Sequence, residues 1–160
     1  MPWTAIKFNN GGVITDDAVY FKICTDQLSA QAMFDKWKKA RDERLPVPSF
    51  TLTQMNARQL TGDARLPAGN CWGLSTTKVT GTFYQLSKTN KVASAATVIN
   101  GYGDDDRRRV RGALVYGQDL HLADTQFFLT AARTIRFIDI DFRANNNDVN
   151  LADLIGLINP

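Results

Sequence analysis

The sequence predicts an α+β fold in a single domain that covers residues 1–160. Segments with strand character and segments with helix character are mixed along the chain, and they lack the regular strand–helix–strand alternation of a parallel sheet. A chain of 160 residues suits one domain and can bury a core without disulfide staples. The nearest approach to a boundary is LPVPSF at residues 45–50, where two prolines stop any helix.

The first third of the chain predicts two strands and one helix. Residues 4–8 and 18–23 are rich in β-branched and aromatic residues, and the Asn and Gly residues at 9–12 favour a tight turn after the first of these segments. Ser29 is expected to cap a helix from about Ala30 to Glu43. Met33, Phe34, Trp37 and Ala40 recur at helical spacing and indicate a stripe that packs in the core.

The remainder predicts a weakly helical segment at 51–60 and strands at 111–117 and 134–142. In the last strand Ile138, Ile140 and Phe142 alternate with Asp139 and Asp141, which places the carboxylates on one face. Residues 76–86 prefer a strand by propensity, although their pattern also permits a helix, and residues 123–133 fit either. The closing segment 150–158 predicts a short amphipathic helix with Asn150 as its cap.

Charge and composition are ordinary for a soluble globular protein. The expected partner is a protein, either as the substrate of a hydrolase or as the partner of a binding protein. The net charge is +3, and the block DDDRRR at 104–109 largely neutralises itself, which favours an exposed turn. We therefore expect no nucleic-acid partner; a nucleic-acid binder using the arginines at 107–111 would lose affinity steeply with added salt. No segment is long and apolar enough to cross a membrane. The N-terminus lacks the pattern of a cleavable signal, so we expect a cytoplasmic protein or one exported by another route.

The sharpest functional signal is a thiol followed by an imidazole and carboxylates. Cys71 precedes the only histidine, His121, which precedes Asp139 and Asp141. An imidazole can take the proton of a thiol, and a carboxylate can hold that imidazole in the correct tautomer. If Cys71 opens a helix, the free N–H groups of the first turn would also stabilise the thiolate, with Asn70 as cap.

The segment Gly69-Asn70-Cys71-Trp72 resembles the nucleophile segment of papain-fold cysteine proteases. The likeness is closer to the YopT-type effector proteases of bacteria, through Leu74-Ser75, His121, the stretch 137–141 and the terminal LADLIGLI. It implies a papain-like fold with an antiparallel sheet packed on helices. It also implies that Cys71 is the nucleophile, His121 the base and Asp139 the orienting acid; Asp141 falls where the family has Asn. Gly69, Asn70 and Trp72 would line the substrate site.

The leading hypothesis is therefore a thiol hydrolase, acting on a peptide bond or on a glutamine amide, that serves as a bacterial effector or toxin. It needs no cofactor. The alternative is a non-catalytic β-rich binding or assembly protein, such as an immunity protein or a particle subunit. It predicts that Cys24 and Cys71, which we expect to be free thiols, are both buried and inert, and that His121 lies far from Cys71. A helix after Cys71 favours the enzyme, whereas a strand favours the binding protein. The substrate and the oligomeric state stay open.

A metal site is not expected. The stretch from Asp139 to Asn150 superficially resembles a calcium loop, but it lacks the glycine at position 6 and the acidic residue at position 12. One histidine and two distant cysteines also make no zinc-ligand pair at the usual spacing.

Overall fold

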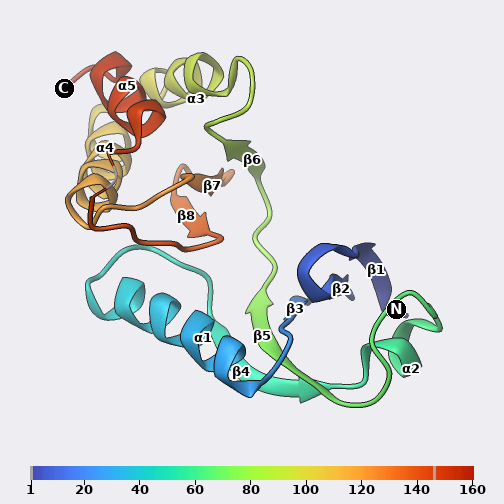
Figure 1. Ribbon diagram of the computed structural model, residues 1–160. Helices are drawn as coiled ribbons and strands as arrows, with labels where there is room; N and C mark the ends of the chain where they lie inside the picture. The colour runs from blue at the N-terminus through green and yellow to red at the C-terminus, as the bar shows by residue number, and fades with distance from the viewer. Residues whose placement is uncertain (1, 146) are drawn as a thin grey trace. The chain divides into compact units, whose positions relative to one another are not determined.

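The computed structural model describes residues 2–145 and 147–160 (Figure 1). Over these residues the chain forms five α-helices and two antiparallel sheets, of five and three strands, so the α+β class is confirmed. It divides into two compact units. Unit 1 comprises residues 1–38 and 48–78, and unit 2 comprises residues 39–47 and 79–160. A single domain over the whole chain stays a prediction.

Unit 1 is built on the five-stranded sheet. Its strands are β1 (Thr4–Lys7), β2 (Val13–Thr15), β3 (Val19–Ile23), β4 (Phe50–Met55) and β5 (Cys71–Thr77), in the spatial order β1-β2-β3-β5-β4. The predicted strands at 4–8 and 18–23 are confirmed. The prediction of a weak helix at 51–60 is wrong for its first half, because those residues form β4 and only the short helix α2 (Ala57–Thr61) follows.

A turn and a short strand link β1 to β3. The expected turn at 9–12 is a single 3-10 turn over Asn9–Gly11, after which Gly12 has a φ of 102°. Strand β2 was not predicted, because three residues carry too little pattern to be recognised.

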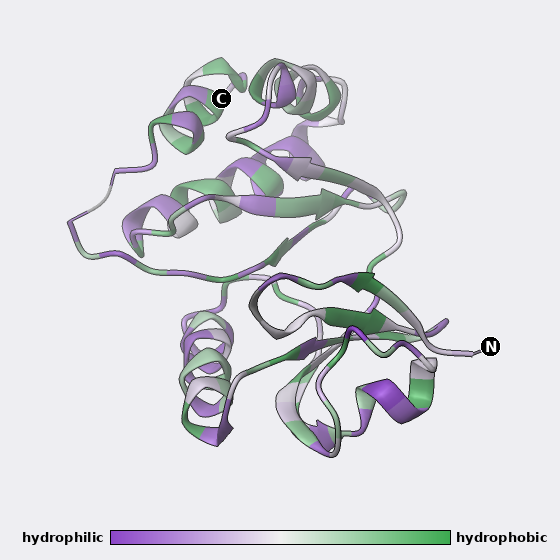
Figure 2. Ribbon diagram, turned by 45° about the vertical axis from the view of Figure 1, so that its right-hand side comes forward, coloured by the Kyte–Doolittle hydropathy of each residue, from purple (hydrophilic) through white to green (hydrophobic). Residues whose placement is uncertain are grey.

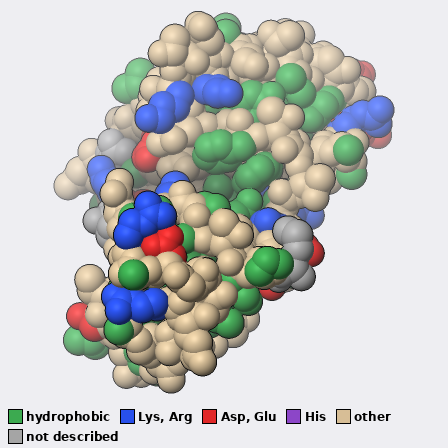
Figure 3. All heavy atoms as spheres, turned by 90° about the vertical axis from the view of Figure 1, so that its right-hand side faces the viewer, with side chains coloured by type: hydrophobic (Ala, Val, Ile, Leu, Met, Phe, Trp, Pro, Cys, Tyr) green, Lys and Arg blue, Asp and Glu red, His purple; other side chains and the backbone are tan. Residues whose placement is uncertain are grey.

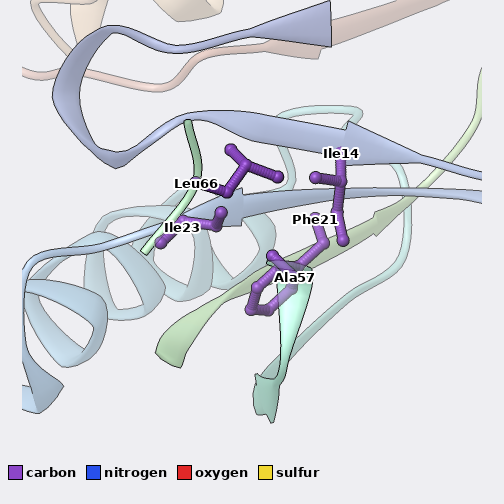
Figure 4. Close-up of a cluster of buried hydrophobic side chains, with 5 residues drawn as sticks. All are labelled: Ile14, Phe21, Ile23, Ala57 and Leu66. Carbon is purple, nitrogen blue, oxygen red and sulfur yellow. The ribbon is translucent and has the colours of Figure 1, made fainter. Parts of the chain in front are cut away.

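One face of this sheet covers a compact hydrophobic cluster. Figure 4 shows its members Ile14, Phe21, Ile23, Ala57 and Leu66, each at most 1% exposed. They come from β2, β3, α2 and the loop before β5. The cluster therefore ties the loop that leads to Cys71 to the centre of the sheet.

Helix α1 (Gln27–Asp42) packs on the sheet through aromatic side chains. The rings of Phe34 and Trp37 lie 5.3 and 5.6 Å from that of Phe50 in β4. The helix starts earlier than expected, and Ser29 is not its cap. Instead Asp26 accepts a hydrogen bond of 2.7 Å from the Ser29 backbone N–H.

Unit 2 combines the three-stranded sheet with three helices. The sheet has the order β6 (Thr82–Gln85), β7 (Gln126–Leu129), β8 (Ile135–Ile138), and the helices are α3 (Lys91–Asn100), α4 (Asp104–Asp119) and α5 (Val149–Leu157). Stacked and edge-on rings of Tyr84, Phe127 and Phe137 form the middle of its core. Hydrophobic and hydrophilic residues alternate along the helices in Figure 2, as expected for helices with one buried face.

Helix α4 corrects two predictions. Residues 104–109 are not an exposed turn, and residues 111–117 are not a strand. The three aspartates occupy the first helical turn, where negative charge is favourable, and Arg107 and Arg109 pair with Asp104 and Asp106 at 2.9 and 3.0 Å. The block does neutralise itself, but it does so by opening a helix.

The end of the chain corrects two further details. Strand β8 ends at Ile138, and its buried residues are Ile135 and Phe137, so the predicted apolar face of Ile138, Ile140 and Phe142 is not one strand face. Helix α5 is confirmed, but its cap is Asp148, whose side chain accepts hydrogen bonds from the backbone N–H groups of Asn150 and Leu151. None of the helices in the described ranges combines the length and the apolarity that a membrane crossing requires.

Candidate functional site

Cys71 opens a strand. It is the first residue of β5, pairs with Met55 of β4, and is followed by six more strand residues. The expected helix terminus at Cys71 is therefore absent from this segment, and Asn70 caps no helix. Part of the expected activation of the thiol was to come from the N–H groups and dipole of a first helical turn, and that part is lost.

The glycines around Cys71 serve the backbone and the packing of unit 1. Gly69 has a φ of +78°, a conformation that favours glycine, and it turns the chain into β5. Gly73 lies under the ring of Phe21: a Cβ at Gly73 would lie 2.6 Å from Phe21 Cζ and would also overlap the carbonyl oxygen of Lys22. The second glycine of GNCWGLST is thus required by a neighbouring strand.

The side chain of Cys71 contacts the hydrophobic cluster of unit 1. It is partly buried, packs against the cluster with Met55, and its Sγ lies 3.7 Å from the carbonyl oxygen of Gly69. Cys24 is buried more deeply, and burial raises the pKa of its thiol above the ordinary value. Both cysteines are free thiols, as expected.

Trp72 and Asn70 flank this thiol in different ways. Trp72 is half-buried on β5, and its carbonyl oxygen accepts a hydrogen bond of 2.9 Å from the Cys24 backbone N–H. Asn70 is exposed in the loop before the strand. Their predicted role in substrate binding stays a prediction.

His121 terminates helix α4. Its φ is +61°, its backbone N–H donates to the carbonyl oxygen of Gln118, and the N–H of Leu122 donates to that of Gly117, both at 3.0 Å. This pair of bonds is the Schellman motif, in which a left-handed residue just after the helix satisfies the last carbonyl groups. The unusual backbone of the only histidine is therefore accounted for by helix termination.

One of the two predicted acids, Asp141, lies on a segment that pairs with the segment of His121. Segments 121–123 and 141–143 run antiparallel. The backbone N–H of Arg143 donates to the carbonyl oxygen of His121 at 3.0 Å, and the backbone N–H of Ala123 donates to the carbonyl oxygen of Asp141 at 2.9 Å. The Asp141 carboxylate pairs with Arg143 at 3.0 Å. Asp139 follows β8 with a φ of +54° and is exposed. The structure thus brings His121 and Asp141 onto neighbouring segments of unit 2.

The thiol and the imidazole belong to different units. Cys71, Gly69, Asn70 and Trp72 lie in unit 1, whereas His121, Asp139 and Asp141 lie in unit 2. A Cys71–His121 pair therefore stays a prediction.

Unit 2 contains a hollow that sequence reasoning missed. It has a volume of about 580 Å³ and lies beside α3 and α5, where Lys88, Asn90 and Asp153 supply polar groups and Leu86, Val92 and Leu157 supply apolar surface. None of the predicted site residues lines it. Part of its lining lies on helix α3, which was not among the elements predicted from the sequence. Recognising that helix would have been the first step toward finding the hollow.

Several charged side chains of the described residues contact one another or the backbone. Within residues 2–145 and 147–160, no three His, Cys, Asp or Glu side chains are grouped so that they could hold a metal ion. On the face drawn in Figure 3, Lys and Arg side chains form separate small groups, and some of them lie against Asp or Glu. Arg107 is also engaged, because it donates to the backbone carbonyl oxygens of Asn159 and Pro160.

Comparisons with models of known protein families, with curated proteins and with solved structures find no match to this chain.

Proposed function

We propose that this chain is a non-catalytic binding or assembly protein in which the segment GNCWGLST forms a turn at its first two residues and a packed strand from Cys71 onward. The observation that carries the proposal is the position of Gly73 beneath the buried ring of Phe21. A nucleophile segment of the papain type would instead form the start of a helix. The motif residues Gly69, Cys71 and Gly73 all have roles in the turn, the core and the sheet of unit 1.

The surroundings of Cys71 also support a structural role. Free cysteine is among the most buried residue types and behaves as a small hydrophobic side chain. Cys71 packs against an apolar cluster, and the only histidine of the chain lies in unit 2. In this proposal the protein binds another chain, and the edge strands of the five-stranded sheet in unit 1 supply the binding surface.

A thiol hydrolase is the second candidate. Two observations favour it: the thiol of Cys71 is only partly buried, and His121 and Asp141 occupy neighbouring segments. The resemblance to YopT-type proteases adds the order Cys71, His121, Asp139. This function would require the thiol of Cys71 to meet the imidazole of His121.

Alkylation with iodoacetamide distinguishes the two candidates. The rate at each cysteine is followed by peptide mass over the pH range in which thiols and imidazoles titrate, in the wild type and in His121→Asn. Asn is chosen because it tolerates the left-handed backbone at this helix end and carries no imidazole. Cys24 serves as the internal reference for a buried thiol with a raised pKa.

For a binding protein we expect the rate at Cys71 to be the same in the wild type and in His121→Asn at every pH. Cys24 should react more slowly still, since burial both hinders access and disfavours its thiolate. Fast labelling of Cys71 in mildly acidic solution that disappears in His121→Asn would show a thiolate–imidazole pair and would establish the hydrolase candidate instead.

A further inference from the structure

The two edges of the five-stranded sheet differ in how well they are protected. Strand β1 forms one edge and β4 forms the other, as the strand order shows (Figure 1). An edge strand presents unpaired backbone N–H and C=O groups, on which a strand from another chain can pair. Proteins that avoid such pairing shorten the edge strand, place charge on it, or interrupt it with a bulge.

Edge strand β1 has all three protective features. It has four residues, it contains Lys7, and its register with β2 shifts between Ala5 and Lys7. The N-terminal edge of the sheet is therefore a poor template for another strand.

Edge strand β4 has none of these features within Phe50–Met55; prolines, which also hinder pairing at an edge, occur only before the strand, at residues 46 and 48. It has six residues, FTLTQM, and pairs with β5 without interruption from Phe50 to Met55. No charged side chain occurs anywhere in residues 45–57. Because the same sheet protects one edge and leaves the other unprotected, the open edge at β4 indicates a docking site for a strand.

The hydrogen bonds of the sheet identify which groups β4 presents. The backbone N–H of Thr77 donates to the carbonyl oxygen of Ser49 at 2.9 Å, so Ser49 directs its backbone N–H and C=O groups toward β5. In an antiparallel ladder this direction alternates along the strand. Thr51, Thr53 and Met55 therefore also bond to β5, whereas Phe50, Leu52 and Gln54 direct their N–H and C=O groups outward. Within the described ranges, the outward groups of Leu52 and Gln54 have no hydrogen-bond partner.

We propose that β4 of a second copy of this chain pairs antiparallel with β4, about a two-fold axis at Leu52. Outward positions then lie opposite outward positions: Leu52 exchanges hydrogen bonds with Leu52 of the second copy, and Phe50 lies opposite Gln54. This inference deepens the proposed binding or assembly function and rests on it, since it names the partner of the same β-rich unit.

The side chains of β4 fit a copy of themselves in this register. Leucine lies opposite leucine, and Thr51 lies opposite Thr53, a pair of β-branched residues of the kind that stabilises neighbouring strands. No charge lies opposite a like charge, because residues 45–57 carry none. Charged residues on a different partner strand would find no opposite charge within residues 45–57.

Cross-linking tests the register. Cys24 and Cys71 are first replaced by Ala, and Leu52→Cys is then oxidised. Residues that exchange both hydrogen bonds have Cα atoms about 5.5 Å apart, which lies within the range that disulfides span, and a small movement of the strands brings the two thiols into contact. We expect Leu52→Cys to form a disulfide-linked dimer. Thr51→Cys is the matched control, because Thr51 of the two copies would be diagonal neighbours about 7–8 Å apart and should cross-link far less.

Sedimentation equilibrium of the full chain tests the association itself. We expect a mass that rises with concentration from 17.8 kDa toward twice that value. Gln54→Pro removes one outward N–H and leaves the ladder with β5 intact, so it should fold and remain a monomer. Thr53→Pro removes a ladder N–H and should unfold β4, which separates loss of pairing from loss of structure.

Each outcome decides between the possibilities. A dimer that is lost in Gln54→Pro and is cross-linked at Leu52→Cys supports pairing through β4. A monomer at all concentrations, or a dimer that Gln54→Pro does not weaken, overturns it; in the first case the edge serves a different protein or none. Fast, His121-dependent alkylation of Cys71 would overturn the proposed function while leaving a β4 dimer standing, so the two failures are distinguishable.

Discussion

Replacing Gly73 by Ala tests whether the segment after Cys71 is a strand or a helix. In the structure a Cβ at this position would lie 2.6 and 2.8 Å from two ring atoms of Phe21, which is fully buried, and would overlap the carbonyl oxygen of Lys22. Neither neighbour can move easily, because β5 is held between β3 and β4. In a helix, by contrast, Ala is favoured over Gly by about 0.5–1 kcal/mol.

The two alternatives therefore predict changes of opposite sign. Overpacking of a core costs about 1–3 kcal/mol, and because both clashes involve rigid groups we expect Gly73→Ala to lower the free energy of unfolding by about 3 kcal/mol. With a urea dependence of about 1–3 kcal/mol per molar, the midpoint should fall by about 1 M or more.

Urea unfolding followed by tryptophan fluorescence suits this measurement, because Trp3, Trp37 and Trp72 all lie in unit 1. Gly112→Ala is the control for the substitution itself, because Gly112 is an exposed position of α4 and a Cβ added there would meet no other atom. We expect this variant to raise the free energy of unfolding by about 1 kcal/mol. Its unfolding is measured by circular dichroism. An unchanged or raised midpoint for Gly73→Ala would refute the strand at Cys71–Thr77 and, with it, the packing role of the motif.

Two further predictions concern helix starts. Asp148→Ala should lower the free energy of unfolding by about 2–4 kcal/mol, because it removes the cap of α5 and leaves the N–H and hydroxyl of Thr125 without their acceptor. The exposed Asp153→Ala is its control, and equal midpoints in denaturant would contradict the role of Asp148. The pKa of Asp26 is lowered mainly by the hydrogen bond from the Ser29 backbone N–H and, to a smaller extent, by the hydrogen bond from the Ser29 hydroxyl. This carboxylate therefore stabilises α1 above its unfolded pKa of about 3.9, and the contribution is lost as the pH falls through the lowered folded value. The melting temperatures of wild type and Asp26→Asn should differ at neutral pH and converge in acid; a gap independent of pH would exclude the charge as its cause.

The sequence determined the elements whose signal is local. Strands β1 and β3 follow from β-branched and aromatic residues, α1 from apolar residues at helical spacing, and the α+β class from the mixture of such segments. The terminal helix was recognised for the same reason, although its cap lies two residues earlier, at Asp148 rather than Asn150. In each case the residues that form the element also carry its pattern.

Tertiary structure decided the rest. Residues 111–117 look like a strand, yet they continue a helix that three aspartates begin and that His121 ends, and Val110, Leu114 and Gly117 face its buried side. Asp139 adopts a left-handed backbone, so the alternation of Asp and Ile after β8 does not describe one strand face. For the candidate site, the sequence supplied the order of Cys71, His121 and the acids. The environment of Cys71 came only from the fold, because Phe21, which requires Gly73, is distant in sequence and meets it only across paired strands.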